Sequence, residues 1–85
     1  MMLTLMYFAR LREALGVSSE RVDLPADVRD VAGLTAWLRN RGDSWEAELA
    51  PGRAFRVAVN QDMAEGATVL KDGDEIAIFP PVTGG

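Results

Sequence analysis

The spacing of apolar residues changes several times along this 85-residue chain, and this constrains the fold more than any other feature. Alternation of apolar and polar residues, typical of half-buried strands, occurs over residues 2–8, 18–24, 54–60 and 75–79. Residues 9–16 and 28–41 instead place apolar residues three or four positions apart, as helices do. A chain of this length forms one domain with a thin core. The pattern predicts an α+β fold.

Glycine, proline and aspartate residues mark the ends of these elements. Gly16 suits the left-handed position after the first helix, and Pro25 stops the second strand. Asp27 offers an N-cap for the helix over residues 28–41. A brief third helical turn over residues 43–49 would be capped by one of its first residues, Asp43 or Ser44.

The segment before the last strand is acidic. Asp72, Asp74 and Glu75 resemble a metal cluster only loosely. Residues 71–74 are better explained as a turn, because an Asp-Gly pair tolerates a positive φ. No metal site is predicted. Residues 61–70 show no clear period, so the sequence leaves open whether they form a strand or a loop.

The order strand, helix, strand, helix, strand, strand predicts one mixed sheet with the helices packed on one face. A right-handed crossover through the long helix would place the first and last strands side by side and parallel, as central neighbours. This arrangement is the β-grasp, or ubiquitin-like, architecture. We expect residues 1–81 to form the β-grasp domain and residues 82–85 to form a flexible C-terminal Gly-Gly tail.

The composition excludes several functions. The chain has no cysteine, hence no thiolate nucleophile, and no histidine, which is the usual general base near pH 7. Its formal net charge of −4 is opposite in sign to that of a nucleic-acid binder. No apolar run could span a membrane, and the first residues do not resemble a signal peptide. We therefore expect a cytoplasmic protein that binds neither nucleic acid nor membrane and is not a self-sufficient enzyme.

The C-terminus is the first candidate functional feature. Pro80 and Pro81 end the last strand, because proline cannot donate a ladder hydrogen bond. The next residues, Val82 and Thr83, would project as a thin arm that leads to a free carboxylate. The last two residues, Gly84 and Gly85, have no side chain and could pass through a narrow channel. The alternative is an ordinary frayed terminus.

The face of the sheet away from the helices is the second candidate feature. If Ile76 and Ile78 contact the long helix, the residues that alternate with them point outward, as do Arg56 and Ala58 on the next strand. An exposed apolar cluster at the root of the tail is typical of a docking surface. The alternative is that the short helix or residues 61–70 cover it. The predicted docking residues are Met6, Phe8, Ala77 and Phe79, with Arg12 close to Phe8.

Three segments of the chain resemble the small subunit of molybdopterin synthase, the MoaD family. They are residues 8–13 (FARLRE), 59–61 (VNQ) and 72–85 (DGDEIAIFPPVTGG). The resemblance covers the whole chain, and its C-terminal segment is highly specific. Residues 43–70 match only loosely outside Trp45 and residues 59–61.

This resemblance implies a sulfur carrier without catalytic side chains of its own, the small subunit of a heterotetrameric enzyme. An E1-like activating enzyme would adenylate the Gly85 carboxylate with ATP, and a sulfur donor would convert it to a thiocarboxylate. Residues 80–85 would then enter the large synthase subunit and deliver sulfur to cyclic pyranopterin monophosphate, in molybdenum cofactor biosynthesis. The chain itself would bind no cofactor. The chemistry fits the composition, because a carrier without cysteine must hold sulfur elsewhere.

Two other functions stay open at this point. The same carrier could serve another recipient, such as the thiazole pathway of thiamine synthesis, although the FPPVTGG ending favours molybdopterin. Alternatively, Gly85 could form isopeptide bonds with lysines, as in a ubiquitin-like protein modifier. A small independent enzyme has almost no support, because histidine and cysteine are missing.

Overall fold

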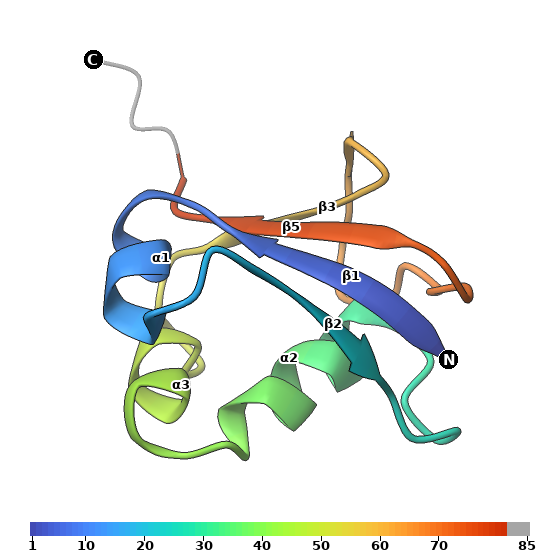
Figure 1. Cartoon of the computed structure of the whole chain (residues 1–85), viewed down its shortest axis with the longest axis horizontal. Coiled ribbons are helices and arrows are strands. Elements are labelled where there is room, and N and C mark those ends of the chain that lie inside the picture. Colours follow the sequence, from blue (N-terminus) through green and yellow to red (C-terminus); the bar gives the residue numbers. More distant parts are fainter. Residues whose placement is uncertain (82–85) are drawn as a thin grey trace.

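The computed structural model describes residues 1–81, so the predicted tail over residues 82–85 lies outside the described residues. The described chain forms three helices and five strands (Figure 1). In chain order they are β1 (Met2–Tyr7), α1 (Ala9–Leu15), β2 (Ser19–Asp23), α2 (Val31–Arg39), α3 (Asp43–Glu48), β3 (Arg56–Val59), β4 (Asp62–Met63) and β5 (Glu75–Phe79). None of the described helices is long and apolar enough to cross a membrane.

The strands form one mixed sheet in the order β2-β1-β5-β3-β4. β1 and β5 are parallel neighbours at its centre, and the other neighbouring strands are antiparallel. In Figure 1, α2 and α3 lie below the sheet, and α1 lies at its left-hand end on the same side. The predicted β-grasp architecture is confirmed, including the central parallel pair. The segment that the sequence left open contributes the short strand β4.

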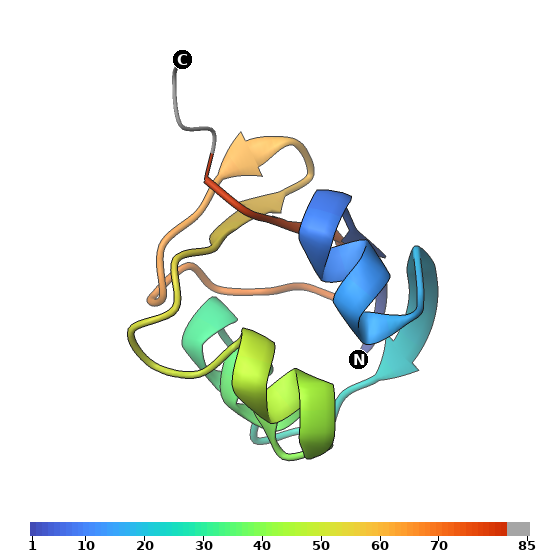
Figure 2. The ribbon, with the colours of Figure 1, turned by 90° about the vertical axis from the view of Figure 1, so that its left-hand side faces the viewer.

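The core lies between the sheet and the helices, which form two layers in Figure 2. The predicted alternation of β1 is confirmed, since Leu3, Leu5 and Tyr7 are at most 1% exposed and the residues between them are half-buried. Gly16 ends α1 in the predicted left-handed conformation, with φ 73°. The other fully buried side chains are Leu11, Leu34, Leu38, Leu49, Ile76 and Ile78.

The longer helix begins later than the sequence predicted. α2 starts at Val31, and its N-cap is Asp30, whose Oδ1 accepts the N–H of Gly33 at 2.8 Å. The predicted start at residue 28 and the predicted cap Asp27 are therefore wrong. Asp27 is exposed and lies in the turn before the helix.

The cause of this late start is a contact between segments far apart in sequence. The N–H of Leu70 donates to the carbonyl of Arg29 at 2.8 Å, and Asp30 forms an antiparallel β-bridge with Val69. This pairing needs extended backbone, and Asp30 has φ −138° and ψ 175°. The helix can begin only after the bridge.

We expect Asp30→Ala to lower the free energy of unfolding by about 1 kcal/mol, the usual cost of losing an N-cap side chain. Asp27→Ala is the matched control, and its effect should stay within about 0.5 kcal/mol because Asp27 is exposed. Urea unfolding followed by circular dichroism measures both values. Equal effects of the two substitutions would contradict the assignment of Asp30 as the cap.

Two other element boundaries differ from the prediction. The N-cap of α3 is Gly42, with φ 81° and no side-chain hydrogen bond, so the prediction that Asp43 or Ser44 caps this helix is wrong. Asp43 already lies within the first turn, one residue beyond the cap. β3 is shorter than the predicted 54–60, because Asn60 belongs to a turn and Ala54 lies outside the sheet.

The turn between β3 and β4 is anchored to the start of β5. Asn60 and Gln61 both have positive φ, at 50° and 73°, as two-residue hairpins of type I′ require. The Nδ2 of Asn60 donates to Oδ1 of Asp74 at 2.9 Å, and its Oδ1 accepts the N–H of Glu75 at 3.0 Å. These bonds join two of the segments that carry the family resemblance.

Tyr7 joins a polar and aromatic cluster on the helix side of the sheet. Its hydroxyl donates to Oε2 of Glu20 at 2.8 Å, and the guanidinium of Arg41 donates to both carboxylate oxygens of Glu20. That guanidinium lies 4.5 Å from the ring centre of Trp45 and 5.1 Å from that of Trp37. The cluster links β1 and β2 to α3 and to the end of α2.

Tyr7 should make stability depend on alkaline pH. Burial raises the pKa of its phenol, and the hydrogen bond to Glu20 raises it further. An unfolded tyrosine ionises near pH 10, so above about pH 10 the unfolded chain releases a proton that the folded chain retains, and stability falls. Unfolding of the wild type and of Tyr7→Phe, measured against pH, should show that this loss depends on Tyr7. Tyrosinate absorbance near pH 10 in a still folded chain, whose only tyrosine is Tyr7, would contradict the expectation.

Candidate partner-docking surface

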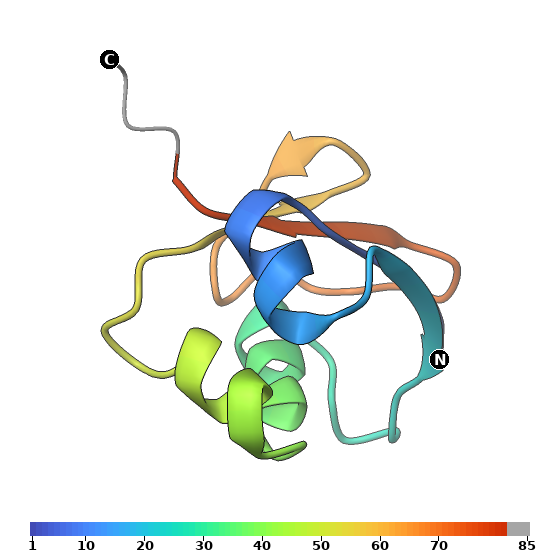
Figure 3. The same cartoon turned by 60° about the vertical axis from the view of Figure 1, so that its left-hand side comes forward.

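The strand register brings the predicted docking residues together on one face. We call the side of the sheet away from α2 and α3 the outer face; it lies uppermost in Figure 3. One row across this face consists of cross-strand partners from four strands, namely Met6, Ala77, Ala58 and Met63. The next row contains Phe79 and its partner Arg56, with Phe8 one position beyond the last paired residue of β1.

The apolar residues of this face remain accessible. Phe8 is 43% exposed and Met63 is 63% exposed, whereas Met6, Ala77 and Phe79 are half-buried. Neither the short helix nor residues 61–70 bury them completely, and the register places them on the face away from α2 and α3; their role in docking stays a prediction. We call Met6, Phe8, Met63, Ala77 and Phe79 together the docking patch.

Phe8 is held in place by the backbone around it. Its N–H donates to the carbonyl of Ile78 at 3.2 Å, which continues the central ladder by one residue. Its carbonyl accepts the N–H of Leu11 at 3.1 Å and starts α1. Between these contacts Ala9 turns the chain with a φ of 53°, an uncommon value for alanine. Phe8 therefore stays beside β5 while the chain turns away into α1.

Ala58 differs from the expectation in one respect. The register places it on the outer face, as predicted, but it is only 6% exposed. Its side chain is small, and it lies between two cross-strand partners, Ala77 and Met63, so its neighbours shield it. Ala58 therefore lies on the outer face but contributes little accessible surface to it.

Sequence reasoning missed Met63. This residue belongs to the segment without a clear period, and its place depends on the two-residue turn that pairs Ala58 with Met63. The available signal was Asn60, because asparagine accepts the left-handed conformation that such turns need. The next residue, Gln61, is not typical of that conformation, which weakens the signal.

Two exposed arginines belong to elements next to the docking patch. Arg12 is exposed on α1, and its backbone N–H lies 3.4 Å from the carbonyl of Phe8; a docking role for its guanidinium stays a prediction. Arg56 is exposed on β3 opposite Phe79. Within residues 1–81, neither guanidinium forms an ion pair. The patch therefore has an apolar centre and one positive group, Arg56, placed beside it by the strand register.

The described chain leaves the sheet beside the docking patch. Pro80 and Pro81 follow β5 and are half-buried, and in Figure 1 this red segment turns away from the helix layer. The other predicted tail residues, Val82, Thr83, Gly84 and Gly85, lie outside the described residues. The docking patch thus lies next to the root of the predicted tail.

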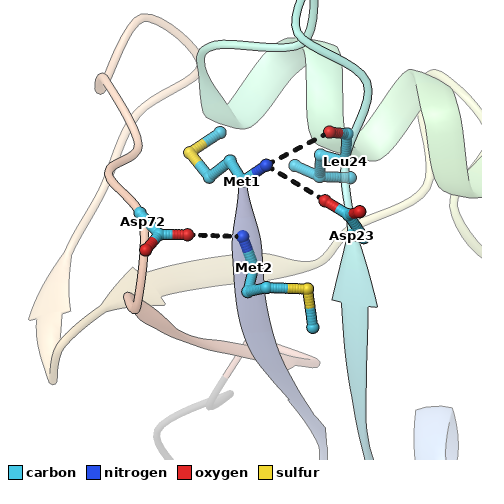
Figure 4. A network of polar contacts seen from close by, with 5 residues as sticks. All are labelled: Met1, Met2, Asp23, Leu24 and Asp72. Carbon is cyan, nitrogen blue, oxygen red and sulfur yellow. Dashed lines mark hydrogen bonds and ion pairs between the residues drawn. The ribbon is translucent and has the colours of Figure 1, made fainter.

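The acidic turn at the opposite end of β5 has a structural role. Gly73 adopts φ 87°, and Oδ2 of Asp74 accepts the N–H of Lys71 at 2.8 Å, which confirms the predicted turn. In Figure 4, Oδ1 of Asp72 accepts the N–H of Met2 at 2.7 Å, and the Met1 ammonium contacts Asp23 at 3.1 Å. Over the range that the structure describes, no group of three or more Asp, Glu, His or Cys residues could hold a metal ion.

Comparison with known sequences shows extensive similarity. Residues 5–85 match the ThiS family. The molybdopterin synthase sulfur carrier subunit of Haemophilus influenzae is 39% identical over 84 residues, which cover 99% of this chain and all of that protein. The subunit of the same name from Escherichia coli is 37% identical with the same coverage.

Solved structures of related proteins have the same fold as this chain. SAMP1 from Haloferax volcanii superposes with a TM-score of 0.81 at 28% identity, and the match covers the whole of both chains. A chain from the complex of subunits 1 and 2 of molybdopterin-converting factor from Helicobacter pylori gives a TM-score of 0.69 at 27% identity, again over both whole chains.

Proposed function

Because this chain belongs to the ThiS family and is a homologue of molybdopterin synthase sulfur carrier subunits, we propose that it carries sulfur on its C-terminal Gly85. The observation that carries the proposal is the position of the docking patch at the end of β5, next to the residues that lead to Gly84 and Gly85. A partner that docks on the patch is then adjacent to the C-terminus.

The proposed loading has two steps, both performed on this chain by partners. The Gly85 carboxylate attacks the α-phosphorus of ATP and releases pyrophosphate, which gives an acyl adenylate. A donor then supplies sulfur at the oxidation level of sulfide, which attacks the acyl carbon; the bond to AMP breaks, AMP leaves, and a thiocarboxylate remains. Activation is needed because a carboxylate oxygen is a poor leaving group. The chain has neither cysteine nor histidine, so an adenylating enzyme must provide the chemistry.

The proposed unloading takes place in the second synthase subunit. In this proposal Val82, Thr83, Gly84 and Gly85 enter its active site together with Pro80 and Pro81. The thiocarboxylate sulfur passes to cyclic pyranopterin monophosphate, and the acyl carbon takes an oxygen atom from water and returns to a carboxylate. The complex of two converting-factor subunits from Helicobacter pylori supports a partner of this kind. The docking patch, with Arg12 beside it, would supply the contact area, since apolar burial contributes about 25 cal/mol per Å².

A protein-modifier role is the second candidate, because the small archaeal modifier protein 1 of Haloferax volcanii superposes on this chain with a TM-score of 0.77 at 27% identity. Modification would join the Gly85 carboxylate to a lysine amine of another protein and release AMP from the adenylate. Conjugates of this chain in a lysate, resistant to reducing agents, would support that role. Co-purification separates the recipients: a molybdopterin synthase large subunit supports the first function, and a thiazole synthase would support a carrier of another pathway.

The direct test is intact-mass spectrometry of the chain incubated with its adenylating enzyme, ATP and a sulfur donor. We expect the mass to change by the replacement of one oxygen atom by sulfur. Omission of ATP is the control and should leave the mass unchanged. An unchanged mass in the complete mixture, with an adenylating enzyme shown to be active on another carrier, would refute the proposal.

A further inference from the structure

A groove of about 300 Å³ opens beside the docking patch, between α2 and the hairpin of β3 and β4. It is lined by Val31, Ala32 and Thr35 of α2, by residues 55–57 at the start of β3, and by residues 63–66 after the hairpin turn. Met63 and Arg56 belong both to this groove and to the outer face. The groove is therefore continuous with the docking patch.

The groove is formed by hydrogen-bonded backbone and needs no rearrangement to open. The N–H of Ala32 donates to the carbonyl of Gly66 at 2.9 Å, and the N–H of Ala64 donates to the carbonyl of Val57 at 2.9 Å. These bonds join the helix, the strand and the loop that enclose it. Its volume lies at the lower limit of small-molecule pockets, which measure about 300–1,000 Å³, and suits one side chain better than a cofactor.

The charged residues of its lining indicate which charge the occupant carries. Arg56 is exposed and forms no ion pair with any residue from 1 to 81, although the protein has a net charge of −4. Glu65 is the acidic residue of the lining. A carboxylate that binds beside Arg56 would meet opposite charge, whereas one beside Glu65 would meet like charge.

We propose that this groove is a second contact site for the partner that docks on the outer face, and that it receives an apolar side chain whose neighbouring carboxylate pairs with Arg56. The inference rests on the proposed function, because the partner is the second synthase subunit. It adds a determinant of partner specificity. The docking patch would hold the partner next to the start of the tail, and the groove would select partners that carry an apolar side chain beside a carboxylate.

The test measures binding of the second synthase subunit by calorimetry at two salt concentrations. Ala32→Phe fills the groove, and Ala47→Phe on α3 is its matched control, since both alanines are exposed on helices. Arg56→Glu reverses the charge, and Arg29→Glu, at an exposed position in the loop before α2, is its matched control. We expect Ala32→Phe and Arg56→Glu each to weaken binding about 10-fold, and the controls to change it less than about 2-fold. Arg56→Glu should also reduce the salt dependence.

Hydrogen exchange of the unaltered chain gives a second readout that does not depend on a variant folding. Binding should slow exchange at the amides of residues 64–67. Unchanged affinity of Ala32→Phe and Arg56→Glu, or unchanged exchange at these amides, together with a loss of binding in Phe79→Asp, would overturn the groove proposal and leave the proposed function intact. If the unaltered chain does not bind the subunit, the proposed function fails as well.

Discussion

Removal of Gly85 is expected to abolish sulfur loading completely and to leave the folded domain unchanged. The acceptor in the proposed reaction is the carboxylate of one particular residue, and a shorter chain would present a carboxylate one residue nearer to the domain. Correct placement of reacting groups contributes several kcal/mol to most enzymatic reactions, so a displacement of about 3.5 Å along the chain is prohibitive. Intact-mass spectrometry after incubation with the adenylating enzyme, ATP and a sulfur donor measures the loss.

Two controls separate this effect from damage to the fold. The thermal unfolding midpoint of the truncated chain should equal that of the wild type, because among residues 1–81 the buried core ends at Ile78. Asp27→Ala, an exposed substitution in the turn before α2, should load normally. Normal loading of the truncated chain would contradict the proposal that Gly85 accepts the sulfur.

Phe79→Asp is expected to weaken binding of the second synthase subunit by about 100-fold. Burial of a phenylalanine side chain contributes about 1.5–3 kcal/mol, and each 1.4 kcal/mol corresponds to a tenfold change in affinity. Aspartate also brings a charge that must lose its hydration in the interface. Phe79 lies between Phe8 and Arg56 at the end of β5, in the centre of the row next to the tail root. Calorimetric titration of the purified subunits measures the affinity.

Val69→Asp is the matched control for this substitution. Val69 is another exposed apolar residue, 65% exposed, but it pairs with Asp30 in the loop after β4 and lies outside the docking patch. We expect Val69→Asp to change the affinity by less than about 3-fold, as for a residue outside an interface. Equal losses in the two variants would show that general surface polarity, and not the docking patch, controls binding.

The sequence predicted the central part of the fold because the relevant signals are local. Strict alternation in β1 and β5 identifies which side chains face the helices, and Gly16 and Pro25 end their elements for reasons of backbone geometry. The same alternation identifies which side chains lie on the outer face. Met6, Phe8, Ala77 and Phe79 therefore lie where the sequence placed them.

The errors arise where distant segments determine local structure. Asp27 and Asp30 are equally good caps in isolation, and the choice depends on the pairing of Asp30 with Val69. The place of Met63 depends likewise on a turn whose second residue, Gln61, gives no local signal. Loop residues that form part of a surface through pairing with another strand are the ones that local patterns identify least well.

The position of β5 has a mechanical consequence under the proposed function, in which the C-terminal end is withdrawn from a partner after each delivery. β5 is paired along both edges, with β1 on one side and β3 on the other. A pull on its C-terminal end acts along the strand, while the ladder bonds lie across it, so they share the load in shear instead of opening one after another. The domain can thus resist repeated extraction without unravelling from the end that is pulled.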